Sequence, residues 1–141
     1  LRSLISNKNI IKIFHFARFD LAVIKKYLNI MCEPIYCTKI ASKIARTYTD
    51  KHGLKELCKE LLNIEISKQQ QSSYWGANVL SENQLQYAAN DVLYLHKIKE
   101  KLDEILIREN RLELVLEAFK YLPSRTELDL RGWINTDIFS H

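Results

Sequence analysis

The chain has 141 residues, the length of one ordinary globular domain, with 47% hydrophobic and 27% charged residues and a net charge of +4. Three glycines and two prolines leave few residues for tight turns, which argues against an all-β sandwich or barrel. Because no apolar stretch reaches about 20 residues and the first residues lack a signal peptide's apolar core, we expect a soluble cytoplasmic protein.

The first half of the chain alternates strand and helix patterns. Residues 9–15 form a β-branched and aromatic run typical of a buried strand, and apolar residues then recur at helical spacing from Arg18 to Leu28. Residues 34–37 predict a short extended segment, after which Thr38 is expected to cap a helix through Arg46. This order predicts an α/β fold, with Asp20 at the junction of the first strand and its helix.

The second half is predicted to be mainly helical. An amphipathic helix follows Gly53, and a long polar connection from Asn63 to Leu80 is then interpreted either as a functional loop or as a disordered one. A Ser-x-x-Gln capping box at Ser81 opens the longest periodic segment, which extends to about Arg108.

A last helix is expected from Leu112 to Tyr121. Pro123 is predicted to stop it, and Ser124 to cap one more turn.

Three cysteines, Cys32, Cys37 and Cys58, form no Cys-x-x-Cys pair. An odd number without such a pair favours reduced, buried thiols over a disulfide framework. Cys32 and Cys37 have the spacing of a zinc half-site, but no second half lies nearby.

Positive charge is concentrated in residues 1–71, which hold 13 Lys and Arg against 6 Asp and Glu. Residues 72–141 hold 8 against 11. A basic half is compatible with a phosphate-bearing partner, but charge alone favours a solvated lysine-rich surface.

Carboxylates are the best candidates for chemistry, because the sequence contains no glycine-rich phosphate loop and no nucleophile-elbow or zinc-protease motif. Tyr87 and Asp91 lie four residues apart in the capped helix, so they share one face. Asp20 follows a strand at the edge where open α/β sheets place their sites. Carboxylates converging from different elements suit a two-metal phosphodiesterase, whereas Asp20 alone also suits an acid that complements the helix dipole.

Two segments resemble the second and third exonuclease motifs of the ribonuclease D family. They are His-Phe-Ala-Arg-Phe-Asp at 15–20 and Gln-Leu-Gln-Tyr-Ala-Ala-Asn-Asp-Val-Leu-Tyr-Leu at 84–95. The intervening segments 38–42 and 52–58 and the C-terminal residues 137–141 follow the order of the short bacterial ribonuclease D-like proteins. The chain is thus similar, along its whole length, to the tyrosine-bearing branch of the DEDD 3′-5′ exonucleases.

This resemblance implies a single 3′-5′ exonuclease domain over residues 1–141, with a ribonuclease H-like α/β fold and a mainly helical C-terminal half. It makes Asp20 and Asp91 the metal-ligating carboxylates and Tyr87 the residue that orients the attacking water. It further implies that two divalent ions, Mg²⁺ or Mn²⁺, take part. The substrate it implies is RNA with a single-stranded 3′ end, and the products are nucleoside 5′-monophosphates.

The chain also departs from the family pattern. The family's Asp-x-Glu motif, which supplies two more carboxylates, has no counterpart, because residues 1–19 contain no Asp or Glu. The sequence starts at Leu1 rather than at Met, so we expect a domain that lacks its leading strands, with an incomplete metal site. A sheet edge exposed in this way predicts poor solubility or coverage by an upstream chain or a second copy. Phe16 and Tyr74 stand where relatives often carry Asn and Asp.

Four further residues are expected to contact nucleic acid. They are His15, Arg18, Lys68 and Gln71, each of which also fits an ordinary surface role. Two other functions stay open: a catalytically inactive exonuclease fragment that at most binds nucleic acid or a partner, and a plain helical interaction protein.

Overall fold

The computed structural model describes the backbone of residues 2–66 and 82–141, and in the second range the side chains from residue 93 onward. Its elements follow in this order: α1 (Arg2–Ser6), β1 (Lys12–Phe14), α2 (Ala17–Leu28), β2 (Ile35–Cys37), α3 (Thr38–Ala45), α4 (Leu54–Leu62), α6 (Glu82–Arg108), α7 (Leu112–Leu128) and the π-helical turn η1 (Asp129–Trp133). The predicted α/β class is confirmed. The short helix α1 was not expected from the sequence.

The two strands pair in parallel, with Lys12 opposite Ile35 and Phe14 opposite Cys37. Helix α2 makes the crossover between them, as a parallel pair requires. All three residues of β2 are buried, whereas those of β1 are only half-buried. Within the described part of the chain, each strand therefore pairs along one edge only.

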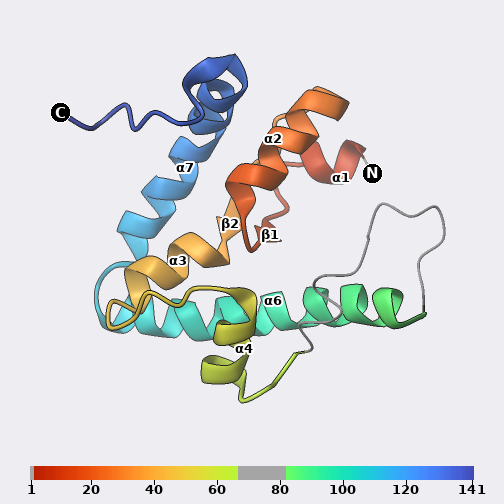
Figure 1. Ribbon diagram of the computed structural model, residues 1–141, viewed down its shortest axis with the longest axis vertical. Coiled ribbons are helices and arrows are strands. Elements are labelled where there is room, and N and C mark those ends of the chain that lie inside the picture. Colours follow the sequence, from red (N-terminus) through yellow and green to blue (C-terminus); the bar gives the residue numbers. More distant parts are fainter. Residues whose placement is uncertain (1, 67–81) are drawn as a thin grey trace.

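Helices cover the strands from two sides (Figure 1). Helix α6 runs across one side and packs against α3, α4 and β1, while α2 and α7 pack together on the other. The buried face predicted for α6 is confirmed at Ile98, Leu102 and Leu106, which are fully buried at one-turn spacing. Asn29 and Asn63, both with positive φ, end α2 and α4 in the left-handed conformation that Asn tolerates.

The expected cap at Thr38 is wrong. Cys37 occupies the N-cap position of α3, without a side-chain capping bond. Because α3 follows β2 directly, Thr38 is fully buried beside β1, and its hydroxyl lies 3.3 Å from the Phe14 carbonyl oxygen. The side chain thus connects helix and strand instead of capping the helix.

The expected end of α7 is also wrong, because the helix continues through Pro123 to Leu128. A proline inside a helix removes one backbone donor, but tertiary packing can maintain the helix around it. Leu122 and Thr126 are buried on either side of Pro123, and the Thr126 hydroxyl donates to the Leu122 carbonyl at 2.8 Å. Ser124 therefore lies inside the helix and caps nothing.

A buried arginine connects α3 to α4. Arg46, only 2% exposed, makes a two-pronged pair with the Glu60 carboxylate at 2.7 and 3.1 Å. Its remaining nitrogen donates to the Ser42 hydroxyl and to the Lys51 carbonyl. One side chain thus fixes the loop between the two helices.

All three cysteines are buried and none forms a disulfide, as the sequence predicts. Among the described helices, none is long and apolar enough to cross a membrane.

Candidate active site

Asp20 lies in the first turn of α2, just beyond the carboxyl end of β1. Its backbone N–H donates to the Phe16 carbonyl at 3.3 Å, which places it on the connection between strand and helix. The carboxylate is half-buried, and no side chain among the described residues donates a hydrogen bond or brings a positive charge to it. Burial raises the pKa of Asp20 to about 6. An unpaired carboxylate in this position is suited to receive a cation.

Tyr87 and Asp91 lie in the N-terminal half of α6, whose helical backbone is confirmed there. Their positions are four residues apart, which places both on one face of the helical backbone. Their side chains fall outside the described set. Helix α6 contacts β1, the strand that leads to Asp20, and passes next to the two strands in Figure 1. The backbone therefore brings the two carboxylate-bearing elements against the same strand.

His15 immediately follows β1 and is half-buried. Its Nδ1 shares a hydrogen bond of 2.9 Å with the Thr38 hydroxyl. Burial, followed by the nearby charge of Lys39, lowers the pKa of His15 to about 4. The imidazole is therefore neutral at neutral pH, and any contact it makes with a nucleic acid is a hydrogen bond rather than an ion pair.

Arg18 is already engaged within the protein. Its guanidinium forms a two-pronged pair with Asp129 at 2.6 and 2.7 Å and donates to the Ile134 carbonyl at 2.8 Å. Its side chain is still 38% exposed, and Nη1 has no partner among the described residues. A phosphate contact from Arg18 would have to use that remaining nitrogen.

The other two predicted nucleic-acid contacts, Lys68 and Gln71, lie outside the described residues. Within the described residues, no group of three or more His, Cys, Asp or Glu side chains is close enough to hold a metal ion. The Asp20 carboxylate, half-buried and unpaired among the described residues, fits the role of a metal ligand.

Asp129, buried and bound to both Arg18 and Arg125, was missed from the sequence. Only the four-residue spacing of Arg125 and Asp129 could have indicated it, since that spacing suits an ion pair on a helix. Nothing in the sequence indicates the long-range pairing with Arg18.

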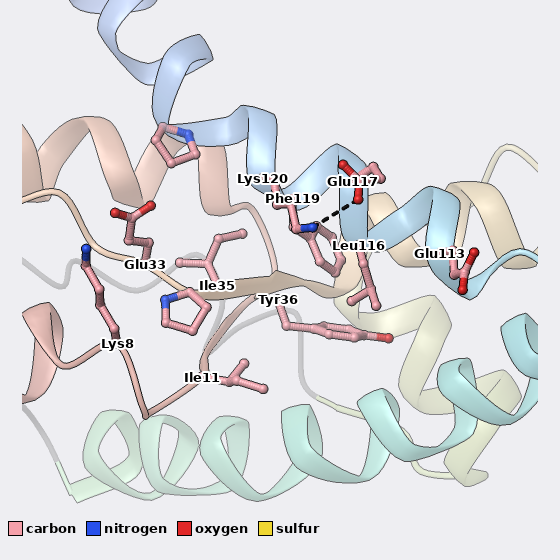
Figure 2. Close-up of a pocket in the computed structure, with 12 residues that line it drawn as sticks. Lys8, Ile11, Glu33, Ile35, Tyr36, Glu113, Leu116, Glu117, Phe119 and Lys120 are labelled. Atoms are coloured by element: carbon pink, nitrogen blue, oxygen red, sulfur yellow. Dashed lines mark hydrogen bonds and ion pairs between the residues drawn. The ribbon is translucent and has the colours of Figure 1, made fainter.

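A groove of about 850 Å³ opens between β2 and α7 (Figure 2). Its floor is apolar and its rim carries charges of both signs. The apolar lining residues are Ile11, Pro34, Ile35, Tyr36, Leu116, Phe119 and Pro123. Of the predicted site residues whose side chains the structure describes, His15, Arg18 and Asp20, none lines this β2–α7 groove.

Comparison with known proteins identifies the family of this chain. A family model described as 3′-5′ exonuclease matches residues 1–107. The chain is 37% identical over 106 residues to DNA polymerase I of Aquifex aeolicus, covering 75% of this chain and 18% of that protein. It is 31% identical over 129 residues to ribonuclease D of Xanthomonas oryzae pv. oryzae, covering 92% of this chain and 35% of that protein.

Among solved structures, Brucella melitensis NrnC is 57% identical and superimposes with a TM-score of 0.92, covering 99% of this chain and 68% of that one. The same protein has been solved with bound Mg²⁺ and bound to pGG. Fold and site thus define a nuclease domain whose candidate ligands are carboxylates. The chain belongs to the DEDD 3′-5′ exonuclease family and is ribonuclease D-like, as its motifs predict. It spans about a third of the length of the ribonuclease D relative.

Proposed function

We propose that this chain is the catalytic domain of a metal-dependent 3′-5′ exoribonuclease, which shortens RNA from its 3′ end and releases nucleoside 5′-monophosphates. The observation that carries the proposal is the Asp20 carboxylate, which lies half-buried and unpaired among the described residues at the carboxyl end of β1. Bound Mg²⁺ in Brucella melitensis NrnC, 55% identical to this chain, supports the metal requirement. We place the activity in RNA processing in the cytoplasm, where the three cysteines stay reduced.

Asp20 and Asp91 hold the divalent ions in this proposal. When bound, such ions lower the pKa of water and neutralise charge on the scissile phosphate. A cation beside Asp20 also reverses the effect of burial, because an opposite charge favours the ionised carboxylate.

The other predicted residues act on the substrate. Tyr87, one turn before Asp91, orients the attacking water in line with the terminal phosphodiester. His15 contacts the RNA strand as a neutral hydrogen-bonding group, and Arg18 through its remaining nitrogen. Lys68 and Gln71 complete the contacts from the segment between α4 and α6.

The test follows a 5′-labelled single-stranded RNA, and separately pGG, in the presence of Mg²⁺, Mn²⁺ or EDTA. The protein is used with any residues that precede Leu1 in its natural reading frame. We expect a ladder of shortened RNA that requires the metal, with nucleoside 5′-monophosphates identified by mass spectrometry. Asp91→Ala and Tyr87→Phe should remove or greatly reduce it, whereas exposed His96, on the same helix, can be changed to Gln as a control.

One observation favours a second function, a non-catalytic module that binds nucleic acid or a partner. Residues 1–19 contain no acidic side chain, so this chain holds two of the family's four carboxylates. Such a module would bind RNA with an affinity that falls steeply with salt and is indifferent to Mg²⁺ and to Asp91→Ala. Metal-dependent shortening lost in Asp91→Ala would eliminate it.

We also propose that the open edge of the two-stranded sheet is covered by an upstream chain or a second copy. The half-buried β1 and the apolar floor of the β2–α7 groove support this. Uncovered strand edges favour pairing with another chain, because their backbone donors and acceptors lack partners.

A further inference from the structure

Three charged side chains, two of them buried and the third half-buried, form a cluster between the start of α2 and the end of α7. Asp129, 7% exposed, accepts from Arg18 at 2.6 and 2.7 Å and from Arg125 at 3.0 Å. Arg125 is itself only 9% exposed. Both arginines hold the pKa of the Asp129 carboxyl below its usual range, with the Arg18 hydrogen bond as the largest cause. We call these three residues the Asp129 clamp.

Two arginines on one carboxylate leave an excess positive charge, which the C-terminal turn compensates with backbone carbonyls. Arg18 donates to Ile134, and Arg125 donates to Trp133 and Thr136. Gly132, with a φ of +114°, permits the reversal of the chain that directs these carbonyls inward. The clamp therefore binds three separate parts of the protein: α2, α7 and the C-terminal turn.

The clamp contacts α2 through Arg18 in the first turn of the helix, which also contains Asp20. That turn lacks a side-chain cap, because Phe16 occupies the N-cap position and makes no capping bond. First-turn N–H groups have no helical partner, so an uncapped start readily frays. Arg18 and Asp20 are about 200° apart around the helix, so the clamp holds α2 on the side away from the Asp20 carboxylate. No charge of the clamp contacts that carboxylate among the described residues.

We infer that Asp129 is a positioning residue for the metal site: through Arg18 it fixes the first turn of α2 and so the placement of the Asp20 carboxylate. This inference rests on the proposed function, in which Asp20 is a metal ligand. It assigns a task to Asp129 and Arg125, which take no part in the proposed RNA and metal contacts. It also separates the two sides of α2, since Arg18 restrains the helix from one side while Asp20 serves the metal from the other.

The experiment measures Mn²⁺ binding by isothermal titration calorimetry without RNA, so that a lost RNA contact at Arg18 does not influence the result. Asp129→Asn keeps the size of the side chain and removes its charge. We expect its dissociation constant for Mn²⁺ to rise about 10-fold, the usual effect of losing a group that orients a metal ligand.

Glu127→Gln is the matched control. Glu127 also lies on α7 and reaches α2, but through Lys25 at 3.8 Å, in the last turn of that helix and five residues after Asp20. It should bind Mn²⁺ like the unchanged protein. If Asp129→Asn fails to fold by circular dichroism, Arg18→Gln gives the same test, because the pairing of Asp129 with Arg125 remains.

The outcomes separate the inference from the proposed function. Weaker Mn²⁺ binding in Asp129→Asn or Arg18→Gln, with Glu127→Gln unaffected, supports the inference. Unchanged Mn²⁺ binding in folded Asp129→Asn, while Asp20→Asn loses it, overturns the inference and leaves the proposed function intact. Unchanged Mn²⁺ binding in Asp20→Asn would remove the proposed metal role of Asp20, and the inference with it.

Discussion

Asp20 and Asp129 are both shielded from water, but among the described residues only Asp129 has charged partners. The Asp129 carboxylate accepts from two arginines, and its pKa is lowered by them. The Asp20 carboxylate meets no donor or cation among the described residues, and burial raises its pKa. A charge that is buried without a partner destabilises the fold, whereas a paired one is tolerated. The unpaired Asp20 is therefore suited to a ligand site, and the paired Asp129 to a structural role.

Asp20→Asn should therefore stabilise the metal-free protein. The amide has nearly the same shape and carries no charge to desolvate, so we expect a gain of about 1 kcal/mol at pH 7.5, reduced from the full burial effect by solvent screening. The melting temperature in EDTA should rise by about 3 °C. Exposed Asp50, changed to Asn, provides the control. A lower melting temperature for Asp20→Asn would contradict the assignment of Asp20 as an unpaired charge.

Asp129 should make the protein sensitive to acid. Because its folded pKa lies below the ordinary 3.8, its contribution to stability is fully present above pH 4 and is lost as the pH falls through the lowered value. Asp129→Asn should lose about 3 kcal/mol at pH 7, since it leaves buried Arg125 without its counter-charge. Urea unfolding at pH 7 and below pH 3 measures the difference in the free energy of unfolding between the unchanged protein and Asp129→Asn. This difference should be smaller at the lower pH. A constant difference would contradict the paired state.

At the scale of elements, side-chain hydrogen bonds and ion pairs connect neighbouring helices and strands. Arg46 ties the end of α3 to Glu60 of α4, and Thr38 ties α3 to β1. Helix α7 also depends on side-chain packing, because the buried Leu122 and Thr126 stabilise the helix on both sides of Pro123. Local propensity therefore gives way to tertiary contacts at these points.

Glu60→Gln tests the connection between α3 and α4. Arg46 is 2% exposed and would lose its counter-charge, while the Glu60 side chain is 38% exposed, so we expect a loss of about 2 kcal/mol in the free energy of unfolding. Glu109→Gln removes an exposed pair with Arg108 and should change stability by about 0.5 kcal/mol or less. Equal effects in urea denaturation would show that the Arg46 pair is an ordinary surface contact.

At the scale of the whole molecule, the β2–α7 groove is a surface that the described site residues His15, Arg18 and Asp20 do not line. The groove has an apolar floor beside a sheet that, in the described residues, pairs along one edge of each strand. Apolar surface of this kind is typical of a site that another chain covers.

Leu116→Glu should therefore prevent association without unfolding the chain. Leu116 lines the groove and is 42% exposed, so a charge there opposes coverage by another apolar surface. Leu114, two residues earlier and 66% exposed, does not line the groove, and Leu114→Glu is the control. Light scattering after size-exclusion chromatography should show association in the unchanged chain and in Leu114→Glu, but not in Leu116→Glu. Association of all three would place the contact elsewhere.

The sequence by itself determined the α/β class, the long helix α6 and the family. Hydrophobic periodicity and the motifs around Asp20 and Tyr87 are local properties, so they can be recognised without knowing which distant residues are in contact. The spacing of Tyr87 and Asp91 likewise needed only a helix, and the helical backbone is confirmed there.

Only the tertiary structure decided which polar groups meet across long separations in the chain. Arg18 and Asp129 are 111 residues apart, and no periodicity relates them. The roles of Thr38 and Pro123 were missed for the same reason: a cap or a stop is a local preference, and buried neighbours outweigh it. Local patterns thus state what each segment can form, while the free energy of packing selects which of those possibilities the molecule adopts.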